Sequence, residues 1–498
     1  MTSSLFAILC LVAAPWFSPN VRIHQERRSH ASFDPAIAIG PGAPSRQPIY
    51  VVYEDDSMAG FVPMDGKLMF QKSTDAGATW LAEDKLVRHI GYTGLSPDVT
   101  TDPDGNIYVV YTGRDTSGSV GHYYCVSSTD GGVTWCEPVR VDDNETEIVV
   151  QWTRVAIDSA GNLFCVWPAK RDGRPNILSS VSTDRGTTWG ASVPVSNDTT
   201  SGFYGFADVD VSVQPGTNQY LVTAVNRRHT SPLPVEIAAY LYRSTDGGRT
   251  FQPGPRLDTF SYLVAQPHVV ADRDHIICDY TGNPGDTDGQ SLTESRTFYA
   301  GPDTWGGVIA VNDTMFRSYY HGGKLALSSD GRVHTVLMVC NASQRYETHY
   351  ASSSDHGASW SGLTRVNDGG VDTQLPDIGA DSEGYAYVVW CDLRSGLNEI
   401  WFSTNHPLAI AEEPPQQPIG VEPPATVVRN VLVLGAVGSR QNTEYRAELL
   451  SIAGRKVLDL KPGANDVRAL APGVYFVLEE PQASSHKPQA IRKVVVTR

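Results

Sequence analysis

An eight-residue motif that recurs five times is the feature that most constrains the fold of this chain. The motif has the form S-[ST]-D-x-G-x-[ST]-[WF], and its copies occupy residues 73–80, 128–135, 182–189, 244–251 and 353–360. Repeats separated by roughly 50 to 60 residues are typical of arrays and propellers. We therefore expect one supersecondary unit, built many times over, rather than a set of unrelated elements.

The residue types of this octet are those of a hairpin turn. The Asp carboxylate can accept hydrogen bonds from backbone N–H groups two and three residues later. The glycine adopts a positive φ that other residues resist, and the closing Trp or Phe fills core volume. The residues expected to build these turns are Asp75, Gly77, Trp80, Asp130, Gly132, Trp135, Asp184, Gly186, Trp189, Asp246, Gly248, Phe251, Asp355, Gly357 and Trp360.

Two strand-like runs precede each octet. In residues 98–111 (DVTTDPDGNIYVVY) two apolar runs flank a D-x-x-G turn, and residues 155–167 and 377–390 repeat this pattern. Weaker copies start near Asp34, Asp208, His268 and Lys324, so that seven units are present. The last unit stops after its third strand, and Val21 to His24 can supply the fourth. The pattern predicts an all-β, seven-bladed β-propeller over residues 21–406.

The octet resembles the Asp-box, or bacterial neuraminidase repeat, of sialidases and other secreted β-propellers. This resemblance spans roughly residues 21 to 406 and implies the fold rather than an activity, because the box is a structural turn in those families. Sialidases are similar to six-bladed propellers, so six blades are the alternative to the seven counted here.

The two ends of the chain differ from the repeat region. Residues 1–20 contain a ten-residue apolar run, LFAILCLVAA, and we expect them to be a signal peptide. Residues 407–424 hold six prolines and three glutamates, which predicts an extended linker. Residues 425–498 contain further strand-like runs, which predict a small immunoglobulin-like β-sandwich.

The C-terminal segment carries three motifs in a fixed order. They are Ser451 to Val457 (SIAGRKV), Leu470 to Phe476 (LAPGVYF) and Arg492 to Val496 (RKVVV). In this order they resemble the sorting domain of type IX secretion, the Por-type domain. The resemblance implies that the type IX machinery is a partner of residues 425–498 and that the protein is secreted or attached to the bacterial outer surface.

Charge and composition exclude several classes of function. The 39 Lys and Arg against 55 Asp and Glu give a net charge of −16. Nucleic-acid binders and polybasic membrane-surface proteins need clustered positive charge, so neither class fits. No other stretch approaches 18 consecutive apolar residues, and no transmembrane helix is expected. We expect a monomer without cofactors.

The cysteines and histidines indicate no metal site. The chain contains neither a CxxC pair nor two histidines at zinc-ligand spacing. Six cysteines remain outside the apolar N-terminal run, and most fall in strand-like runs, which favours buried free thiols. A bridge between Cys125 and Cys136 is the alternative, because the two residues flank a tight turn.

A ligand site is expected on the face opposite the octets, where the loops from second to third strand and from blade to blade gather around the channel. Arginines at this face can bind carboxylates of a ligand, and aromatic side chains can stack on sugar rings. The structural alternatives are that the arginines form ion pairs between blades and that the aromatic side chains plug the channel. The ligand-binding candidates are Tyr92, Trp152, Arg154, Tyr204, Arg227, Arg317 and Tyr319.

These features favour a secreted or surface propeller that binds a glycan or another surface polymer without catalysis. The first alternative is a glycoside hydrolase of sialidase type. Such an enzyme needs three arginines around the substrate carboxylate and a Tyr nucleophile activated by a Glu. Its candidates are Arg114, Arg171, Arg394 and Tyr320, but no partner Glu can be assigned. The second alternative is a structural or adhesive surface protein.

Overall fold

The protein is described from a computed structural model, in which the chain divides into two units, residues 1–410 and 411–498. Each unit is described by itself. Every secondary-structure element assigned in the described residues is a β-strand. The described residues are 17–24, 30–43, 46–59, 62–90, 96–114, 121–143, 152–171, 174–196, 208–217, 219–229, 235–259, 263–283, 292–301, 304–312, 323–341, 343, 345–368, 371–407, 426–428, 431–434, 447–451, 455–461, 463–479 and 490–496.

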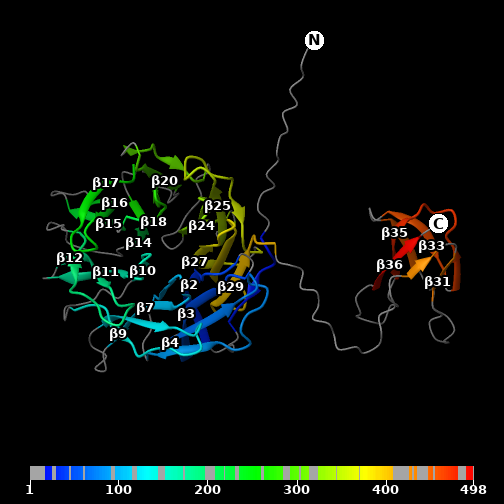
Figure 1. Ribbon diagram of the computed structural model, residues 1–498, viewed down its shortest axis with the longest axis horizontal. Coiled ribbons are helices and arrows are strands. Elements are labelled where there is room, and N and C mark those ends of the chain that lie inside the picture. Colours follow the sequence, from blue (N-terminus) through cyan, green and yellow to red (C-terminus); the bar gives the residue numbers. More distant parts are fainter. Residues whose placement is uncertain are drawn as a thin grey trace, which may run out of the picture. The chain divides into compact units, whose positions relative to one another are not determined.

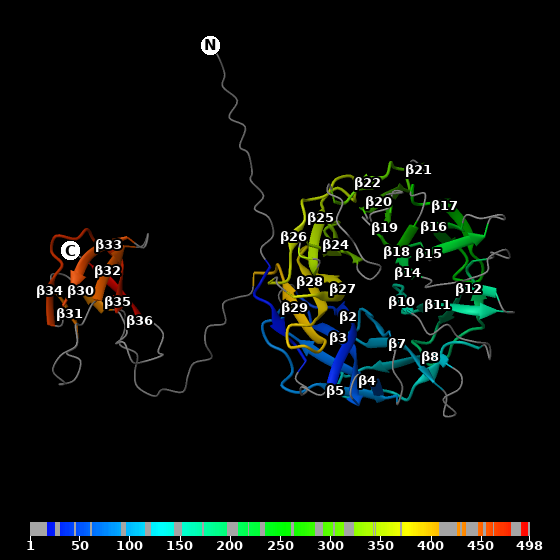
Figure 2. The same ribbon diagram turned by 180° about the vertical axis from the view of Figure 1, so that it is seen from behind.

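The first unit is a seven-bladed β-propeller. Its strands form seven antiparallel sheets in chain order, each a single blade of the ring. In Figure 1 the first strands that carry a label lie nearer the centre of the ring than the outer strands of their blades, and Figure 2 shows the same ring from behind. The predicted seven-bladed architecture is confirmed, and the six-bladed alternative is wrong.

Blades 1 to 3 follow the predicted strand pairs. Blade 1 contains β2 (His30–Ile39), β3 (Ile49–Ala59), β4 (Val62–Ser73) and β5 (Lys85–His89). Blade 2 contains β6 (Asp98–Thr101), β7 (Ile107–Arg114), β8 (Gly121–Ser128) and β9 (Val139–Arg140). Blade 3 contains β10 (Arg154–Ile157), β11 (Leu163–Arg171), β12 (Arg174–Ser182) and β13 (Val193–Pro194).

Blades 4 to 6 include the units whose sequence pattern is weaker. Blade 4 contains β14 (Val209–Gln214), β15 (Gln219–His229), β16 (Val235–Ser244) and β17 (Gln252–Arg256). Blade 5 contains β18 (Leu263–Ala271), β19 (His275–Asn283), β20 (Leu292–Tyr299), β21 (Thr304–Trp305) and β22 (Ile309–Ala310), which also pairs with β20. Blade 6 contains β23 (Gly323–Leu327), β24 (Val333–Cys340), β25 (Tyr346–Ser353) and β26 (Thr364–Arg365).

Blade 7 closes the ring with both ends of the unit. It contains β27 (Thr373–Ala380), β28 (Ala386–Asp392) and β29 (Glu399–Thr404), and its fourth strand is β1 (Val21–Arg22). Val21 pairs with Phe402 and Arg22 with Trp401. The residue after β1, Ile23, is fully buried and belongs to the apolar cluster between blades 7 and 1. The N-terminal strand therefore covers the edge of β29 and completes blade 7 with a fourth strand.

The octets connect the third and fourth strands of their blades. In the first octet the Asp75 carboxylate accepts from the Thr79 N–H at 2.8 Å and from the Thr79 hydroxyl at 2.6 Å. The Ser73 hydroxyl accepts from the Gly77 N–H at 2.9 Å. The principal backbone donor to Asp75 therefore lies four residues later, not two or three, and the first serine is a second capping group that the sequence did not indicate.

The core lies between the blades. Each apolar cluster of the ring joins side chains of neighbouring sheets, as Phe70 of blade 1 does with Val109 of blade 2. The octet aromatics pack across the same boundaries, with Trp80 against Phe402 at 5.0 Å and Trp135 against Phe70 at 5.4 Å between ring centroids. Burial between blades thus holds the ring together and fixes the positions of its inner strands.

The second unit contains two sheets. Their residues Leu432, Leu449 and Val477 are fully buried in one cluster. One sheet has five strands, β30 (Thr426–Val428), β36 (Ala490–Val496), β35 (Gly473–Glu479), β32 (Ala447–Ser451) and β33 (Lys456–Leu460), and the other has two, β31 (Val431–Leu434) and β34 (Gly463–Asp466). The immunoglobulin-like topology of this unit stays a prediction.

The cysteines outside the N-terminal run are free thiols. Cys125 is buried and Cys136 is exposed, and neither forms a disulfide. Cys165, Cys278, Cys340 and Cys391 are buried thiols within strands. Within the described part of the chain, no helix has the length and apolar character required to cross a membrane.

Candidate functional site

A pocket occupies the centre of the ring at the face opposite the octets. Each inner strand begins at this face, because the turn after it and the octet both lie at the other end of the blade. The pocket encloses about 600 Å³, part of it open to solvent. All seven blades contribute to its lining, with Asp34, Pro35, Ala36, Ser96, Pro97, Trp152, Arg154, Asp208, Val209, Gln266, Pro267, His268, Lys324, Leu375, Pro376 and Asp377.

Four lining residues have a left-handed backbone. They are Asp34, Ser96, Gln266 and Leu375, with φ of 47°, 38°, 50° and 50°, and each is followed directly by a proline. In blades 1, 5 and 7 this residue lies at a register shift of the first strand. A positive φ costs free energy in a residue other than glycine and is retained only where the surroundings enforce it. The rim of the pocket therefore has a rigid, strained backbone.

Aspartates of the inner strands tie neighbouring blades together. Asp98 accepts from the Val155 N–H at 2.8 Å and Asp377 from the Ile37 N–H at 2.9 Å. Asp210 repeats the contact between blades 4 and 5, where it accepts from the Val269 N–H at 3.1 Å. Burial raises the pKa of Asp210, although His268, Lys324 and Arg154 act in the opposite direction. These carboxylates have a structural role.

Lys324 crosses the channel beneath the pocket mouth. Its Nζ lies 3.4 Å from Asp98 Oδ1 of blade 2 and 3.3 Å from Asp377 Oδ2 of blade 7. The Lys324 side chain is only 17% exposed, and a buried charge requires partners of opposite charge. The two nearly buried carboxylates provide them. A ligand at this face would thus meet a polar floor rather than an open channel.

Arg154 and His268 also line the pocket. Arg154 lies 4.0 Å from Asp210 through Nε, a distance too long for a hydrogen bond, and donates to its neighbour's carbonyl through Nη1. His268 Nδ1 lies 2.7 Å from Asp279, whose second oxygen accepts from Thr335 at 2.9 Å. The orientation of the His268 ring is therefore fixed, while the Arg154 guanidinium has hydrogen-bonding capacity left.

The structure brings together only part of the predicted set. Trp152 and Arg154 line the pocket. Arg394 lies instead in the turn between β28 and β29, where its guanidinium contacts Asp392 at 2.6 Å and Trp401 at 3.6 Å from the ring centroid. Both contacts lie within blade 7, so they are not the ion pair between blades that the sequence left open, and the role of Arg394 at a ligand site stays a prediction.

The remaining candidates lie where the structure gives no side chain. Arg114, Arg171 and Arg227 belong to strands β7, β11 and β15, and their side chains are outside the described part. The other five candidates, Tyr92, Tyr204, Arg317, Tyr319 and Tyr320, are outside the described residues altogether.

Sequence reasoning placed Asp377 on this face but missed Lys324, His268, Asp34 and Asp208 as parts of the pocket. A signal for them exists, because an acidic residue or a histidine adjoins a proline at the start of four inner strands. The dipeptides are Asp34-Pro35, Pro97-Asp98, Pro267-His268 and Pro376-Asp377. The proline recurs directly after the residue of positive φ, and the residue after the proline is Asp98, His268 or Asp377 in blades 2, 5 and 7 but Ala36 in blade 1.

Comparison with known proteins identifies a family and a fold. The model of the family described as BNR repeat-like domain matches residues 15–276. A search of curated protein sequences gave no match.

Three solved structures of similar fold illustrate the comparison. An ulvan lyase, described as a new family of polysaccharide lyase, has a TM-score of 0.51 at 11% identity, over 75% of this chain and 93% of its own. An α-L-arabinanase from Penicillium chrysogenum has a TM-score of 0.46 at 14% identity, over 78% and 98%. A Hadza microbial sialidase has a TM-score of 0.43 at 17% identity, over 75% and 65%. At these identities the likeness concerns the fold alone.

Proposed function

The chain belongs to the BNR repeat-like domain family, whose match covers more than half of it, and we propose from this premise that it binds a glycan or a similar surface polymer at the central pocket. The observation that carries the proposal is the lining itself. All seven blades contribute to the lining, which includes Trp152 and Arg154, and four of its residues adopt a positive φ that the surrounding structure enforces. Pre-organised concave sites bind with less ordering cost.

The chemistry of the lining suits a sugar. The indole of Trp152 offers an apolar face on which a pyranose ring can stack. Arg154 supplies donors for hydroxyl groups. Asp34 and Asp208 already accept from the Ser96 hydroxyl at 3.0 Å and the Gln266 N–H at 2.9 Å, respectively. One aromatic face with a few fixed polar groups is the composition expected of a small-molecule or carbohydrate subsite.

The same lining does not supply the sialidase constellation. Among the described residues that line the pocket there is one arginine, and there is neither a tyrosine nor a glutamate. A Tyr nucleophile with its Glu base and an arginine triad are what that chemistry requires. We propose binding without turnover on the strength of Trp152 and Arg154 in the lining, and an assay for turnover tests the enzyme alternative.

Affinity measurements on the full-length chain test this proposal. The protein is screened on a glycan array, and the best ligand is then titrated calorimetrically. Trp152→Ala and Arg154→Gln should each weaken binding at least about tenfold, because each removes a principal contact. Arg185→Gln is the matched control, since Arg185 lies in an octet and pairs with Asp104 at 2.8 Å. Equal effects of all three variants, or of none, would overturn the placement of the site.

A carbohydrate-cleaving enzyme is the second candidate, and one observation favours it. His268 lines the pocket, and the buried Asp279 holds its ring through Nδ1 at 2.7 Å. A histidine oriented by a carboxylate is a common general base. Turnover of a polysaccharide or glycoside that is abolished by His268→Gln but retained in Arg185→Gln would establish this candidate instead.

We further propose that the chain is exported to the bacterial surface through residues 425–498. The order of the three C-terminal motifs and the Pro/Glu-rich segment before them support this route. Residues 425–498 begin beyond the last propeller strand and belong to the second unit, so the propeller should fold without them.

Deletion of residues 425–498 tests the export route. We expect the shortened protein to accumulate inside the cell envelope, while the circular dichroism of its propeller stays unchanged. A normal amount of shortened protein at the surface or in the medium would contradict the sorting role. A loss of folding would contradict the independence of the two units.

The N-terminal contacts sharpen the export proposal. Phe17 packs on Tyr350 at 5.1 Å between ring centroids, and Ser18 donates its N–H to Thr404 at 2.7 Å. Cleavage after Ala14 preserves these contacts, whereas cleavage after residue 20 removes them. We therefore expect N-terminal sequencing of the exported protein to begin before Phe17.

A further inference from the structure

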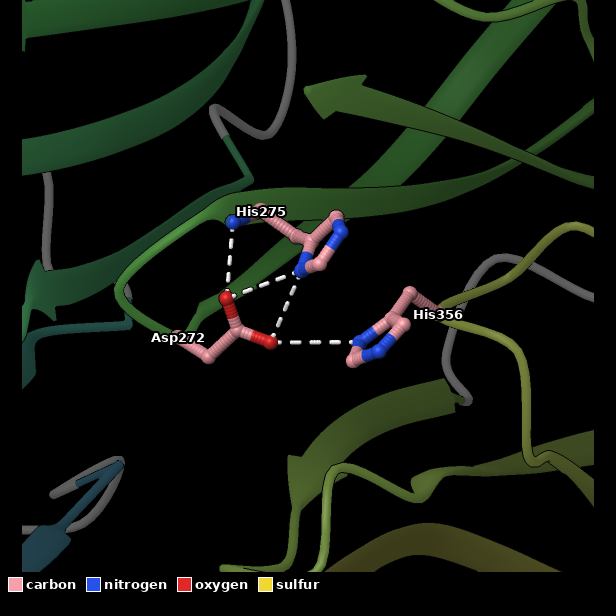
Figure 3. Close-up of side chains that lie close together, drawn as sticks. All are labelled: Asp272, His275 and His356. Atoms are coloured by element: carbon pink, nitrogen blue, oxygen red, sulfur yellow. Dashed lines mark hydrogen bonds and ion pairs between the residues drawn. The ribbon is translucent and has the colours of Figure 1, made fainter. Parts of the chain in front are cut away.

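Three potential metal ligands meet on the octet face, away from the central pocket. They are Asp272, which follows β18, His275, which begins β19, and His356, which lies in the octet of blade 6. One ligand atom from each lies within 4.8 Å of the others. Figure 3 shows both imidazole rings turned toward the one carboxylate, from two separate segments of the chain.

The Asp272 carboxylate is held with one oxygen directed at both rings. Its Oδ1 accepts from the N–H groups of Asp274 and His275 at 2.8 and 2.7 Å. Its Oδ2 lies 3.0 Å from His275 Nδ1 and 3.1 Å from His356 Nδ1. Two ligands of a tetrahedral zinc ion are about 3.3 Å apart, given bonds of about 2.0–2.1 Å. The two contacts of Asp272 are close to that spacing, and an ion is admitted once one of the stacked rings turns to direct its Nδ1 at the same point.

The two imidazole rings are pre-arranged side by side. Their centroids are 3.9 Å apart and their planes differ by 15°. The edge of Tyr299 packs on His275 at 5.5 Å, and His356 Cε1 lies 3.1 Å from the place a Cβ would take on Gly331. The three side chains are 21% to 32% exposed, so an ion and a bound water can reach them.

An ordinary ion pair between blades is the competing explanation, and blade 3 shows what one looks like. Arg185 occupies the octet position of His356 and reaches Asp104 of the preceding blade at 2.8 Å. That contact uses one cation and needs no second ligand. The cluster at blades 5 and 6 adds a second imidazole, which would repel the first if both were protonated. A second imidazole nitrogen at the same carboxylate oxygen is a feature that an ion pair does not need and that a shared cation does.

We propose that Asp272, His275 and His356 form a site for a divalent transition-metal ion of the zinc class, which links blade 5 to blade 6. Two imidazoles and one carboxylate suit zinc and its neighbours, whereas calcium and magnesium prefer oxygen ligands alone. Water completes the coordination, because three protein ligands leave one tetrahedral position open. The site is separate from the glycan-binding pocket and independent of the function proposed for it.

Zinc titration of the full-length chain, without a histidine tag and after treatment with EDTA, tests this site. We expect one zinc ion per chain in competition with a chromophoric chelator, and a rise of the thermal unfolding midpoint on zinc binding. Calcium should produce neither effect. His356→Ala should weaken zinc binding at least about tenfold, and Ala76 shows that this octet position accepts alanine at φ 58°.

His356→Arg separates the metal site from an ion pair, because it copies the arrangement of Arg185 in blade 3. We expect this variant to keep the wild-type unfolding midpoint in EDTA and to lose the response to zinc. Asp272→Asn and His275→Gln should lose that response as well. The proposal would be overturned if the wild-type chain bound no zinc, or if all three ligand variants bound it with unchanged affinity.

Discussion

Two adjacent positions of the octet obey different rules, although both have a positive φ. The residue after the Asp varies, being Ala76, Gly131, Arg185, Gly247 and His356 in the five copies, with φ from 55° to 73°. The next residue is glycine in every copy. A Cβ there would lie 2.2 Å from Phe402 at Gly77 and 2.3 Å from Phe70 at Gly132. Contact with the neighbouring side chains, rather than φ alone, therefore explains the glycine.

Substitution of the two glycines within one octet tests this rule. Gly247→Ala meets nothing within 4 Å and should cost about 1 kcal/mol of unfolding free energy, from backbone strain. Gly248→Ala places a Cβ 2.7 Å from Val181 Cγ2 and should cost about 1–3 kcal/mol more, from overpacking. The measurement is chemical unfolding of both variants beside the wild type. Equal losses would show that φ alone requires the glycine.

The octet carboxylates predict how stability depends on pH. Hydrogen bonds, the largest from the Thr134 hydroxyl, lower the pKa of Asp130 to about 2, and Thr250 does the same for Asp246. Because an unfolded Asp has a pKa of about 3.9, this stabilisation is complete above that pH and is lost as the pH falls toward 2.

Replacement of the two threonines isolates this effect. Thr134→Val with Thr250→Val should unfold at a lower temperature than the wild type at pH 6. The difference between the two midpoints should narrow from pH 4 downward and be mostly lost near pH 2, because about half of the wild-type carboxylates are then protonated. A difference that stays constant over this range would show that the hydroxyls act through packing instead.

At the scale of elements, turn chemistry made the blades predictable. The octets and the D-x-x-G turns located strand pairs even where the apolar pattern is weak, and β2, β14, β18 and β23 begin at or near the predicted positions. The missing fourth strand of blade 7 was predicted at Val21 to His24, and β1 forms there as Val21–Arg22. Blade 5 lacks an octet and has two short strands, β21 and β22, after its third.

The candidate site could be predicted only in part, because side chains meet there across blades. Lys324 and Asp98 are 226 residues apart, and their contact follows from closure of the ring rather than from any local pattern. The same holds for His275 and His356, whose spacing in the sequence argued against a metal site. Trp152 and Arg154 could be predicted as pocket residues because they lie at the start of an inner strand, and inner strands begin at the pocket face.

Ring closure through the N-terminal segment is open to direct test. Ile23 is fully buried between blades 7 and 1, and its N–H donates to Ile400 at 3.0 Å. Ile23→Ala should lower the free energy of unfolding by about 2–4 kcal/mol, through the cavity that it leaves. Val21→Ala is the control, since Val21 is only partly buried and should cost less than half as much. Equal losses in calorimetry would mean that closure does not depend on this anchor.

At the scale of the whole molecule, the propeller presents two different faces. One carries the pocket lined by the starts of all seven inner strands. The other carries the octets and the Asp272, His275 and His356 cluster. Blades with side chains gathered at the ring axis suit recognition of a ligand. The net charge of −16 disfavours an acidic polymer as that ligand, because like charges repel unless counter-ions are present.

The account's central claim is that the pocket binds a glycan and does not cleave it, and one measurement addresses both parts. The best array ligand is incubated with the full-length protein, with Trp152→Ala and with Arg185→Gln, and bound and released sugars are followed over hours by mass spectrometry. We expect intact ligand bound by the wild type and by Arg185→Gln, and at least about tenfold less bound by Trp152→Ala. Release of shortened sugars by the wild type, lost on His268→Gln, would contradict the claim.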